Sequence, residues 1–222
     1  MHLPDNLVSL EINAGAATAS VLAVGAALWR GSKTLTERQV PLLGSTAAFI
    51  FAAQMLNFPV GAGVSGHFLG ATLAAMLLGP LNACLIMAVV LIIQCLGFVD
   101  GGVTALGSNI FNMGIVGGFV GYGLLAAFSK MLPRKRAVFI GVTFVAAWAS
   151  VMVASAVCAL ELVFSGRSAM ENILPPMLAF HAVIGLGEGV ITCAMASMLL
   201  AVRPDLVQAW NTPREHLAGS VA

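Results

Sequence analysis

Residues 81–98 read LNACLIMAVVLIIQCLGF, eighteen residues without a single charged side chain. An α-helix rises 1.5 Å per residue, so this run is nearly long enough to cross a hydrocarbon core about 30 Å thick. The whole chain has the same character. Of its 222 residues, 59% are hydrophobic and 9% are charged, and the mean hydropathy is +0.99. Soluble domains carry about 25% charged residues, so we predict an all-α integral membrane protein with several spans.

Working outward from this run, the same criterion predicts about seven membrane helices in one membrane domain over residues 1–222. The third helix is short, and Gly79-Pro80 separates it from the fourth. The first Arg or Lys is Arg30, after the first apolar run, so we expect a retained helix and not a cleavable signal peptide. The predicted helices cover about 7–29, 40–57, 67–79, 81–98, 106–130, 137–164 and 177–202, and a tail follows over 203–222.

The basic residues predict the orientation. With seven spans and the amino terminus outside, nine of the ten Lys and Arg residues fall on the cytoplasmic side, and Arg167 alone falls outside. Cytoplasmic loops carry the excess of Lys and Arg, which favours an outer amino terminus and a cytoplasmic tail. We therefore predict a multi-pass membrane protein with this orientation. The nine residues are Arg30, Lys33, Arg38, Lys130, Arg134, Lys135, Arg136, Arg203 and Arg214.

Three of the four histidines then lie at or near the outer face, namely His2, His67 and His181, while His216 lies in the tail. The amine of Met1, the deprotonated amide of His2 and Nδ1 of His2 can bind one metal ion through five- and six-membered chelate rings. His67 can supply a fourth nitrogen. Four nitrogens in a square plane suit Ni(II) or Cu(II), and binding must release protons, so affinity should rise with pH. The alternatives are that His2 is solvated and that His67 packs or caps its helix.

The four cysteines and the glycine pairs have simpler interpretations. The cysteines lie inside apolar runs without CxxC spacing, so we interpret them as small buried hydrophobes. Glycines four residues apart let helix backbones approach closely, either within the bundle or against a partner. The cysteines are Cys84, Cys95, Cys158 and Cys193, and the glycine pairs are Gly114/Gly118, Gly117/Gly121 and Gly185/Gly189.

Four ordered motifs carry a family resemblance over about residues 1–202: MHLPDNLVS (1–9), GVSGHFLGATLAAMLLGP (63–80), VDGGVTALGSNIFNMG (99–114) and HAVIGLGEGVIT (181–192). Together they resemble the cobalt/nickel substrate-binding membrane subunit, CbiM/NikM type, of energy-coupling-factor (ECF) transporters. The resemblance implies seven helices in a bacterial or archaeal cytoplasmic (inner) membrane, with the amino terminus inserted as a plug. It also implies that Met1, His2 and His67 bind the metal. Asn6 departs from the family, which often has glycine after Pro-Asp.

Polar residues near the outer face could orient these ligands, since metal-binding histidines usually need hydrogen-bond partners. Asn109 and Asn112 lie three apart, so one helix face could present both amides. The alternative is that Asp100 and Ser108 cap helices. We interpret His181 and Glu188, seven apart on one helix face, as supporting or structural groups and not as ligands. The supporting candidates are thus Ser108, Asn109, Asn112, His181 and Glu188.

The predicted function is capture of Co²⁺ or Ni²⁺ as a transport substrate, without any further cofactor. The chain lacks the phosphate-binding sequence GxxxxGK[ST], because GSKT at 31–34 has the wrong spacing. ATP hydrolysis is therefore expected in partners, and the chain itself is not expected to be an enzyme. The resemblance implies a transmembrane coupling (T) subunit and two cytoplasmic ATPase (A) subunits, and it allows a small accessory membrane subunit. Membrane lipid is expected as a further partner. Nucleic acid is not, because the net charge is only +1.

Two other functions fit the sequence less well. A standalone proton-coupled carrier or channel usually needs a chain of intramembrane acids or histidines, and the middle of the bilayer offers mainly Glu188 and amides such as Gln54 and Gln94. A membrane metalloenzyme would need an open metal site with a general base, and the sequence has no HExxH. The absence of a fused extra domain slightly favours cobalt over nickel.

Overall fold

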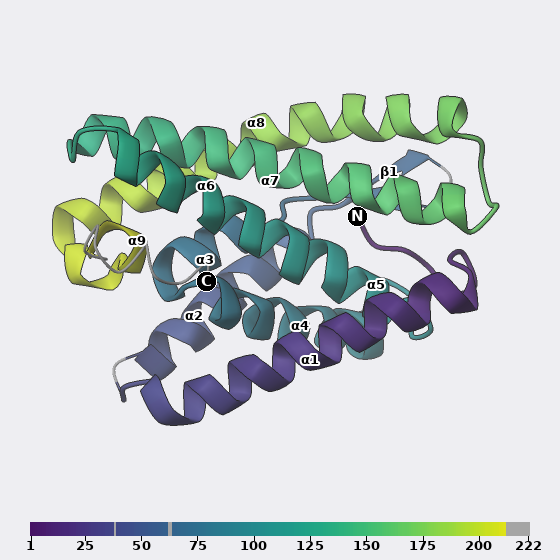
Figure 1. The fold of residues 1–222 in the computed structure, drawn as a ribbon, viewed down its shortest axis with the longest axis horizontal. Coiled ribbons are helices and arrows are strands. Elements are labelled where there is room, and N and C mark those ends of the chain that lie inside the picture. The colour runs from purple at the N-terminus through teal and green to yellow at the C-terminus, as the bar shows by residue number, and fades with distance from the viewer. Residues whose placement is uncertain (38, 62–63, 212–222) are drawn as a thin grey trace.

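The computed structural model describes residues 1–37, 39–61 and 64–211. The long helices lie side by side along the long axis, and the amino terminus lies inside the bundle between α1 and α7 (Figure 1). In chain order the elements are α1 (Leu10–Thr34), α2 (Gln39–Gln54), β1 (Phe58–Gly61), β2 (Val64–Gly66), α3 (Ala71–Leu78), α4 (Pro80–Phe98), α5 (Leu106–Ile110), the π-helix η1 (Phe111–Val116), α6 (Gly117–Met131), α7 (Arg136–Phe164), α8 (Met170–Val202), the 3₁₀-helix η2 (Pro204–Leu206) and α9 (Gln208–Asn211).

Within the described residues, five segments are long and apolar enough to cross a membrane: α1, α4, the continuous α5–η1–α6, α7 and α8. The predicted span 40–57 is the 16-residue α2. The predicted helix 177–202 begins earlier, at Met170, and contains Pro175 and Pro176. The chain is thus a mostly helical, multi-pass membrane protein, as its composition predicts.

The prediction of a helix from residue 67 is wrong. The antiparallel strands β1 and β2 extend to Gly66, and residues 67–70 follow as an irregular segment before α3 begins at Ala71. Gly70 has a φ of +81°, and a Cβ there would lie 2.7 Å from Cγ1 of Ile50. A left-handed conformation in such close contact requires glycine, so the backbone cannot be helical there. His67 therefore lies on a loop and not on a helix.

The short helix α3 is the centre of the main hydrophobic core, because every one of its eight residues is buried. The predicted break after it is confirmed: Gly79 ends α3 with a φ of +81° and a ψ of 164°, and Pro80 is the first residue of α4. Proline suits the first helical position because its missing N–H has no partner there in any case. This break lets α3 fold back inside the bundle, surrounded by the longer helices.

Glycine pairs let the helices approach within the bundle. Gly117 and Gly121 face Ala71 and Thr72 of α3, and Gly114 faces α4 at Cys84. Gly185 and Gly189 of α8 face aromatic rings of α7. The internal-packing interpretation of these pairs is confirmed. The cysteines are free thiols; Cys84, Cys95 and Cys158 are buried and Cys193 is half-buried.

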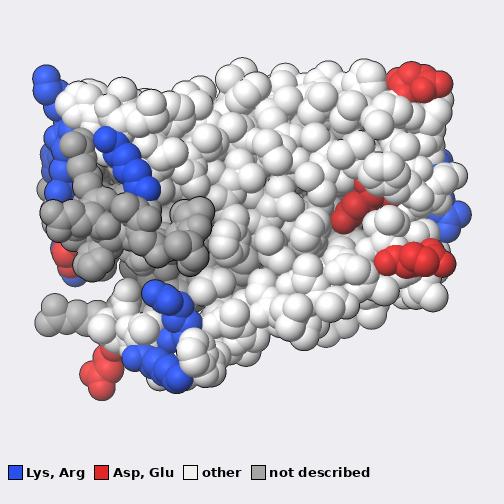
Figure 2. All heavy atoms as spheres, viewed as in Figure 1, with Lys and Arg blue, Asp and Glu red and all other residues white. Residues whose placement is uncertain are grey.

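Charge is distributed unevenly between the two ends of the bundle. Basic side chains gather mostly at the end where α9 lies, and acidic side chains are more frequent at the other end (Figure 2). Lys33 and Lys130 lie in the last turns of α1 and α6, Arg30 lies just before the last turn of α1, and Arg167 lies between α7 and α8. Arg38, Arg214 and His216 lie outside the described residues.

Candidate metal-binding site at the amino terminus

Residues 1–6, which we call the plug, enter the bundle ahead of α1. The exposed fractions of Met1, His2 and Leu3 are 2%, 3% and 0%. Leu3 anchors a second hydrophobic cluster, formed with the hairpin and with the ends of α7 and α8 that lie around the plug. Burial of three consecutive residues is unusual for a chain terminus, because termini are usually poorly ordered unless something holds them.

Hydrogen bonds from residues 102–109 hold the plug backbone. The side chain of Asn109 binds both polar groups of Leu3: its Oδ1 accepts from the backbone N–H at 2.8 Å, and its Nδ2 donates to the carbonyl at 3.1 Å. The N–H of Gly102 also donates to the Leu3 carbonyl, at 2.9 Å. This two-point contact resembles strand pairing, and it sets the register of the two preceding residues.

Two consecutive glycines make room for the plug. A Cβ on Gly102 would lie 2.3 Å from the backbone nitrogen of Asp5, and one on Gly101 would lie 3.6 Å from Cδ2 of His2. Gly101 also has a φ of +90°, which favours glycine. The sequence VDGG therefore forms a cradle that any larger residue at position 102 would fill.

The plug leaves the bundle through a turn that is fixed by side chains. Oδ1 of Asp5 accepts hydrogen bonds from the N–H and the hydroxyl of Thr104, both at 2.7 Å. Asn6 has a φ of +62°. Glycine tolerates this left-handed conformation best and asparagine is the usual alternative, which explains why Asn6 can stand where the resembling family often has glycine.

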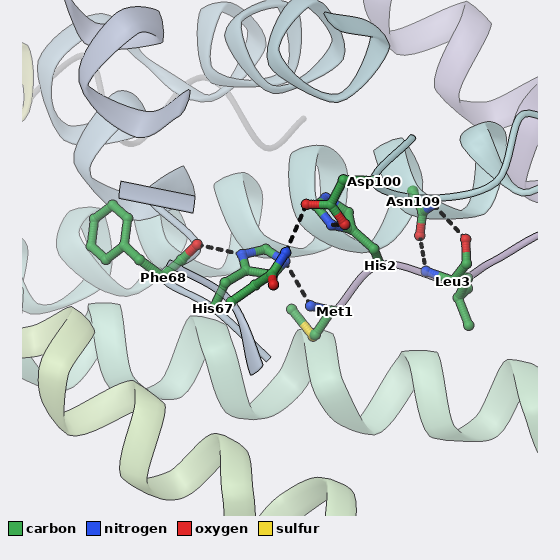
Figure 3. A network of polar contacts seen from close by, with 8 residues as sticks. Met1, His2, Leu3, His67, Phe68, Asp100 and Asn109 are labelled. Atoms are coloured by element: carbon green, nitrogen blue, oxygen red, sulfur yellow. Dashed lines mark hydrogen bonds and ion pairs between the residues drawn. The ribbon is translucent and has the colours of Figure 1, made fainter. Parts of the chain in front are cut away.

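The terminal amine meets His67 inside the bundle. The amine nitrogen of Met1 lies 2.7 Å from Nε2 of His67 (Figure 3). Nδ1 of the same ring lies 2.7 Å from the carbonyl oxygen of Phe68. A carbonyl can only accept, so Nδ1 carries the proton and Nε2 presents its lone pair to the amine. This is the tautomer that a metal ligand at Nε2 requires.

Side chains of α2 and α8 hold the loop that carries His67. The carboxylate of Glu188 accepts hydrogen bonds from the N–H groups of Leu69 and Gly70, at 2.7 and 2.8 Å. Nε2 of Gln54 donates to the carbonyl of Leu69 at 2.7 Å. Irregular backbone at this depth needs such partners, because there is no bulk water to supply them.

The His2 ring stacks on the His67 ring, with the centroids 4.5 Å apart. Its Nδ1 lies 2.7 Å from Oδ1 of Asp100, whose other oxygen accepts from Nδ2 of Asn57 at 2.9 Å. Nε2 of His2 is buried and has no hydrogen-bond partner among the described residues. Asp100 is 16% exposed, so it connects the buried ring with the surface.

Burial favours the uncharged forms of these nitrogens. It lowers the pKa of the Met1 amine from 8.0 to about 5. Burial, followed by the charge of the terminal amine, also lowers the pKa of His67 well below its usual value. At neutral pH the two nitrogens are therefore unprotonated bases, as metal binding requires.

The structure places the predicted supporting residues in different surroundings. Asn109 contacts the plug directly, and Ser108 binds Oδ1 of Asn13 on α1. Asn112 instead donates to Glu161 of α7, and Nδ1 of His181 donates to the Met177 carbonyl of its own helix. Capping by Ser108 is wrong, because Ser108 lies within α5. The cap residue at the end of α4 is Val99, and the backbone N–H of the next residue, Asp100, also bonds the carbonyl of Gln94 there.

The sequence does not predict several of these contacts. They are the bonds of Asp100 to His2 and of Thr104 to Asp5, and the close approach of Gly102 to the plug. Asp100, Gly102 and Thr104 share one signal, the motif VDGGVT at 99–104, whose two consecutive glycines indicate a close backbone approach. Among the residues that the structure describes, no three His, Cys, Asp or Glu side chains form a metal cluster. A metal ion at this site would thus need the terminal amine and backbone nitrogen as well.

The chain is similar to metal transport proteins in sequence and in fold. Residues 2–206 match the profile of the CbiM family, described as the cobalt uptake substrate-specific transmembrane region. A putative fused nickel transport protein NikMN of Archaeoglobus fulgidus is 40% identical over 96% of this chain and 70% of its own length. A putative metal transport protein of Haloquadratum walsbyi is 39% identical over 93% of both chains. A crystal structure of a transition metal transporter superposes with a TM-score of 0.83 at 30% identity, covering 91% of this chain and 93% of that one.

Proposed function

The chain belongs to the CbiM family of cobalt uptake transmembrane proteins, and we propose that it captures Co²⁺ or Ni²⁺ with its own amino terminus. The four ligands are the Met1 amine, the deprotonated His2 amide, Nδ1 of His2 and Nε2 of His67. The relatives are named as nickel, cobalt or metal transport proteins, so the function proposed is that of a transport subunit and not of an enzyme.

The observation that carries the proposal is the 2.7 Å separation between the Met1 amine and Nε2 of His67. Two nitrogens on adjacent corners of a square plane, each about 2.0 Å from the ion, are about 2.8 Å apart. The ion can therefore replace the proton between these two nitrogens with little movement of either. The stacked His2 ring lies beside them.

His2 must change its partner when the ion enters. Its Nδ1 faces Asp100 in this structure, although the six-membered chelate ring needs that nitrogen. Asp100 thus accepts the Nδ1 proton in a hydrogen bond and orients the ring before binding. For Nδ1 to bind the ion, that proton must move to Nε2 of the ring or leave to solvent. Metal binding also removes the amide proton of His2, so affinity rises with pH.

The assembly and the orientation are part of the same proposal. The basic end of the bundle faces the cytoplasm of a bacterial or archaeal cell, and the plug faces outward. The chain would work as the substrate-binding subunit of an ECF transporter, with a T subunit and two ATPase subunits supplying the energy. Reconstituted protein that transports Ni²⁺ or Co²⁺ without these partners would instead indicate the standalone carrier.

The decisive experiment measures Ni²⁺ and Co²⁺ binding by the intact protein after one glycine is added before Met1. The extension moves the amine away from His67, so binding should fall at least a hundredfold, as it should in His2→Ala and His67→Ala. A glycine added after the last residue is the matched control and should leave binding unchanged. Normal binding by the amino-terminally extended protein would exclude the amine as a ligand.

A further inference from the structure

The carboxylate of Glu188 is bound to the backbone just beyond His67. It is 1% exposed, it projects from the middle of α8, and each of its oxygens accepts one N–H, from Leu69 and from Gly70. The first of these groups matters most. The N–H of Leu69 belongs to the same peptide unit as the carbonyl of Phe68, which accepts the proton of His67 Nδ1.

One peptide unit therefore connects the carboxylate with the imidazole. In a trans peptide the N–H and the C=O point in opposite directions. Glu188 holds the N–H side, and His67 binds the carbonyl side of the same plane. A carboxylate that accepts the N–H polarises the unit and makes its carbonyl a better acceptor, because hydrogen bonds in a chain strengthen one another.

The neighbouring contacts keep this peptide unit in place. Nε2 of Gln54 donates to the Leu69 carbonyl, so α2 and α8 hold the Leu69 backbone between them. The N-cap residue of α3 is Gly70, which has no side chain to bind the first N–H groups of the helix. A carboxylate at a helix amino terminus is also favoured by the helix dipole. Geometry and charge thus both place the Glu188 carboxylate here.

We propose that Glu188 is a positioning residue for the metal ligand His67, acting through the Phe68–Leu69 peptide unit. The relay fixes the His67 tautomer with a bare Nε2, aims that nitrogen at the terminal amine and raises its basicity as a ligand. Metal-binding histidines commonly donate their second N–H directly to a carboxylate or a carbonyl. Here the carboxylate acts one peptide unit further away. This inference rests on the proposed function, in which His67 binds the ion.

The test uses the full chain in detergent, with Ni²⁺ for affinity and Cu²⁺ for the electron paramagnetic resonance spectrum. The spectrum reports how many nitrogens bind the copper. Loss of groups that support a metal ligand typically costs 10- to 100-fold in metal affinity. We expect Glu188→Ala to lose that much Ni²⁺ affinity and to change the Cu²⁺ spectrum from four nitrogens to three. Glu188→Gln, which offers one acceptor oxygen in place of two, should lie between wild type and Glu188→Ala.

A spectroscopic readout separates positioning from folding. In Glu188→Ala the plug still supplies three nitrogens, so a three-nitrogen spectrum shows that the site is folded and lacks only His67. Free imidazole should then restore the four-nitrogen spectrum. Glu161→Gln is the matched control: Glu161 is also a buried carboxylate, on α7, but it binds Asn112 and is expected to leave both readouts unchanged.

Two outcomes overturn the inference. One is wild-type Ni²⁺ affinity with a four-nitrogen spectrum in both Glu188 variants. The other is an equal loss of affinity in Glu161→Gln, which would mean that any buried carboxylate matters equally. His67→Ala distinguishes this failure from failure of the proposed function. If His67→Ala also keeps four nitrogens, the proposed ligand set itself is wrong.

Discussion

The terminal amine of Met1 and Nε2 of His67 lie 2.7 Å apart, although 66 residues separate them in the chain. Both groups are buried. The docked plug keeps the amine in place, and the hydrogen bond to the Phe68 carbonyl keeps the imidazole in place. A site prepared in this way loses little conformational entropy when the ion binds. Docking of the plug and binding of the ion are therefore closely coupled in the proposed function.

Gly102→Ala should weaken Ni²⁺ binding more than tenfold. The new Cβ would lie 2.3 Å from the nitrogen of Asp5 and 2.6 Å from the carbonyl carbon of Pro4, so the plug backbone must move away. A displaced plug cannot keep its amine beside His67. Titration of the detergent-solubilised protein with Ni²⁺ measures the effect. Gly97→Ala is the control, because a Cβ there meets nothing within 4 Å, and wild-type affinity in both variants would contradict the cradle.

Asn109→Asp should loosen the plug. Asn109 both accepts from and donates to the Leu3 backbone, whereas a carboxylate can only accept and would face the Leu3 carbonyl with a like partial charge. The Leu3 carbonyl would keep its bond from the N–H of Gly102 but lose the one from Nδ2, and a lost hydrogen bond typically costs about 0.5–1.5 kcal/mol. Hydrogen exchange of the amino-terminal peptide, followed by mass spectrometry, should become at least several-fold faster. Asn172→Asp, at an exposed position of α8, should leave that exchange unchanged.

The sequence predicted the pairing of the amino terminus with His67 because both parts carry recognisable signals. A histidine at position 2 can form a chelate with the terminal amine, and the stretch GVSGHFLG belongs to one of the four motifs that together carry the family resemblance. The apolar runs likewise predicted the five long spans, since length and composition alone decide whether a helix can cross a membrane. In these cases local sequence and global structure agree.

The supporting contacts could not be predicted, because they join residues between 49 and 119 positions apart in the chain. Nothing near Glu188 indicates that its carboxylate binds the backbone at Leu69, and Asn112 differs from Asn109 only in the helix face it occupies. The π-helix from Phe111 to Val116 changes the rotation of that face, so a spacing of three did not bring both amides to the plug. The sequence does not predict that α3 starts as late as Ala71, because its N-cap residue is Gly70, which has a left-handed backbone conformation.

Plug docking should weaken as the pH falls from 8 to 5. Burial lowers the pKa of the Met1 amine to about 5 when docked, against 8.0 in water. Between these values the undocked amine binds a proton that the docked amine does not, so acid favours undocking. The stability of the docked state should be fully present above pH 8 and should decrease by about 1.4 kcal/mol per pH unit below it. Exchange of the amino-terminal peptide, corrected for the intrinsic pH dependence of exchange, measures this. A pH-independent protection factor would contradict burial of the amine.

Gly189→Ala should destabilise the packing of α7 on α8 without touching the metal ligands. A Cβ at this position would lie 2.7 Å from two ring carbons of Phe144, and the same face carries Gly185 against Trp148. Overpacking of this kind typically costs about 1–3 kcal/mol, because the ring must leave its preferred position. Thermal unfolding in detergent should therefore begin several degrees lower. Gly187→Ala is the matched control on the same helix, since a Cβ there meets nothing within 4 Å and alanine favours the helix. If the two variants unfold at the same temperature, close approach at Gly189 does not contribute to the stability of the bundle.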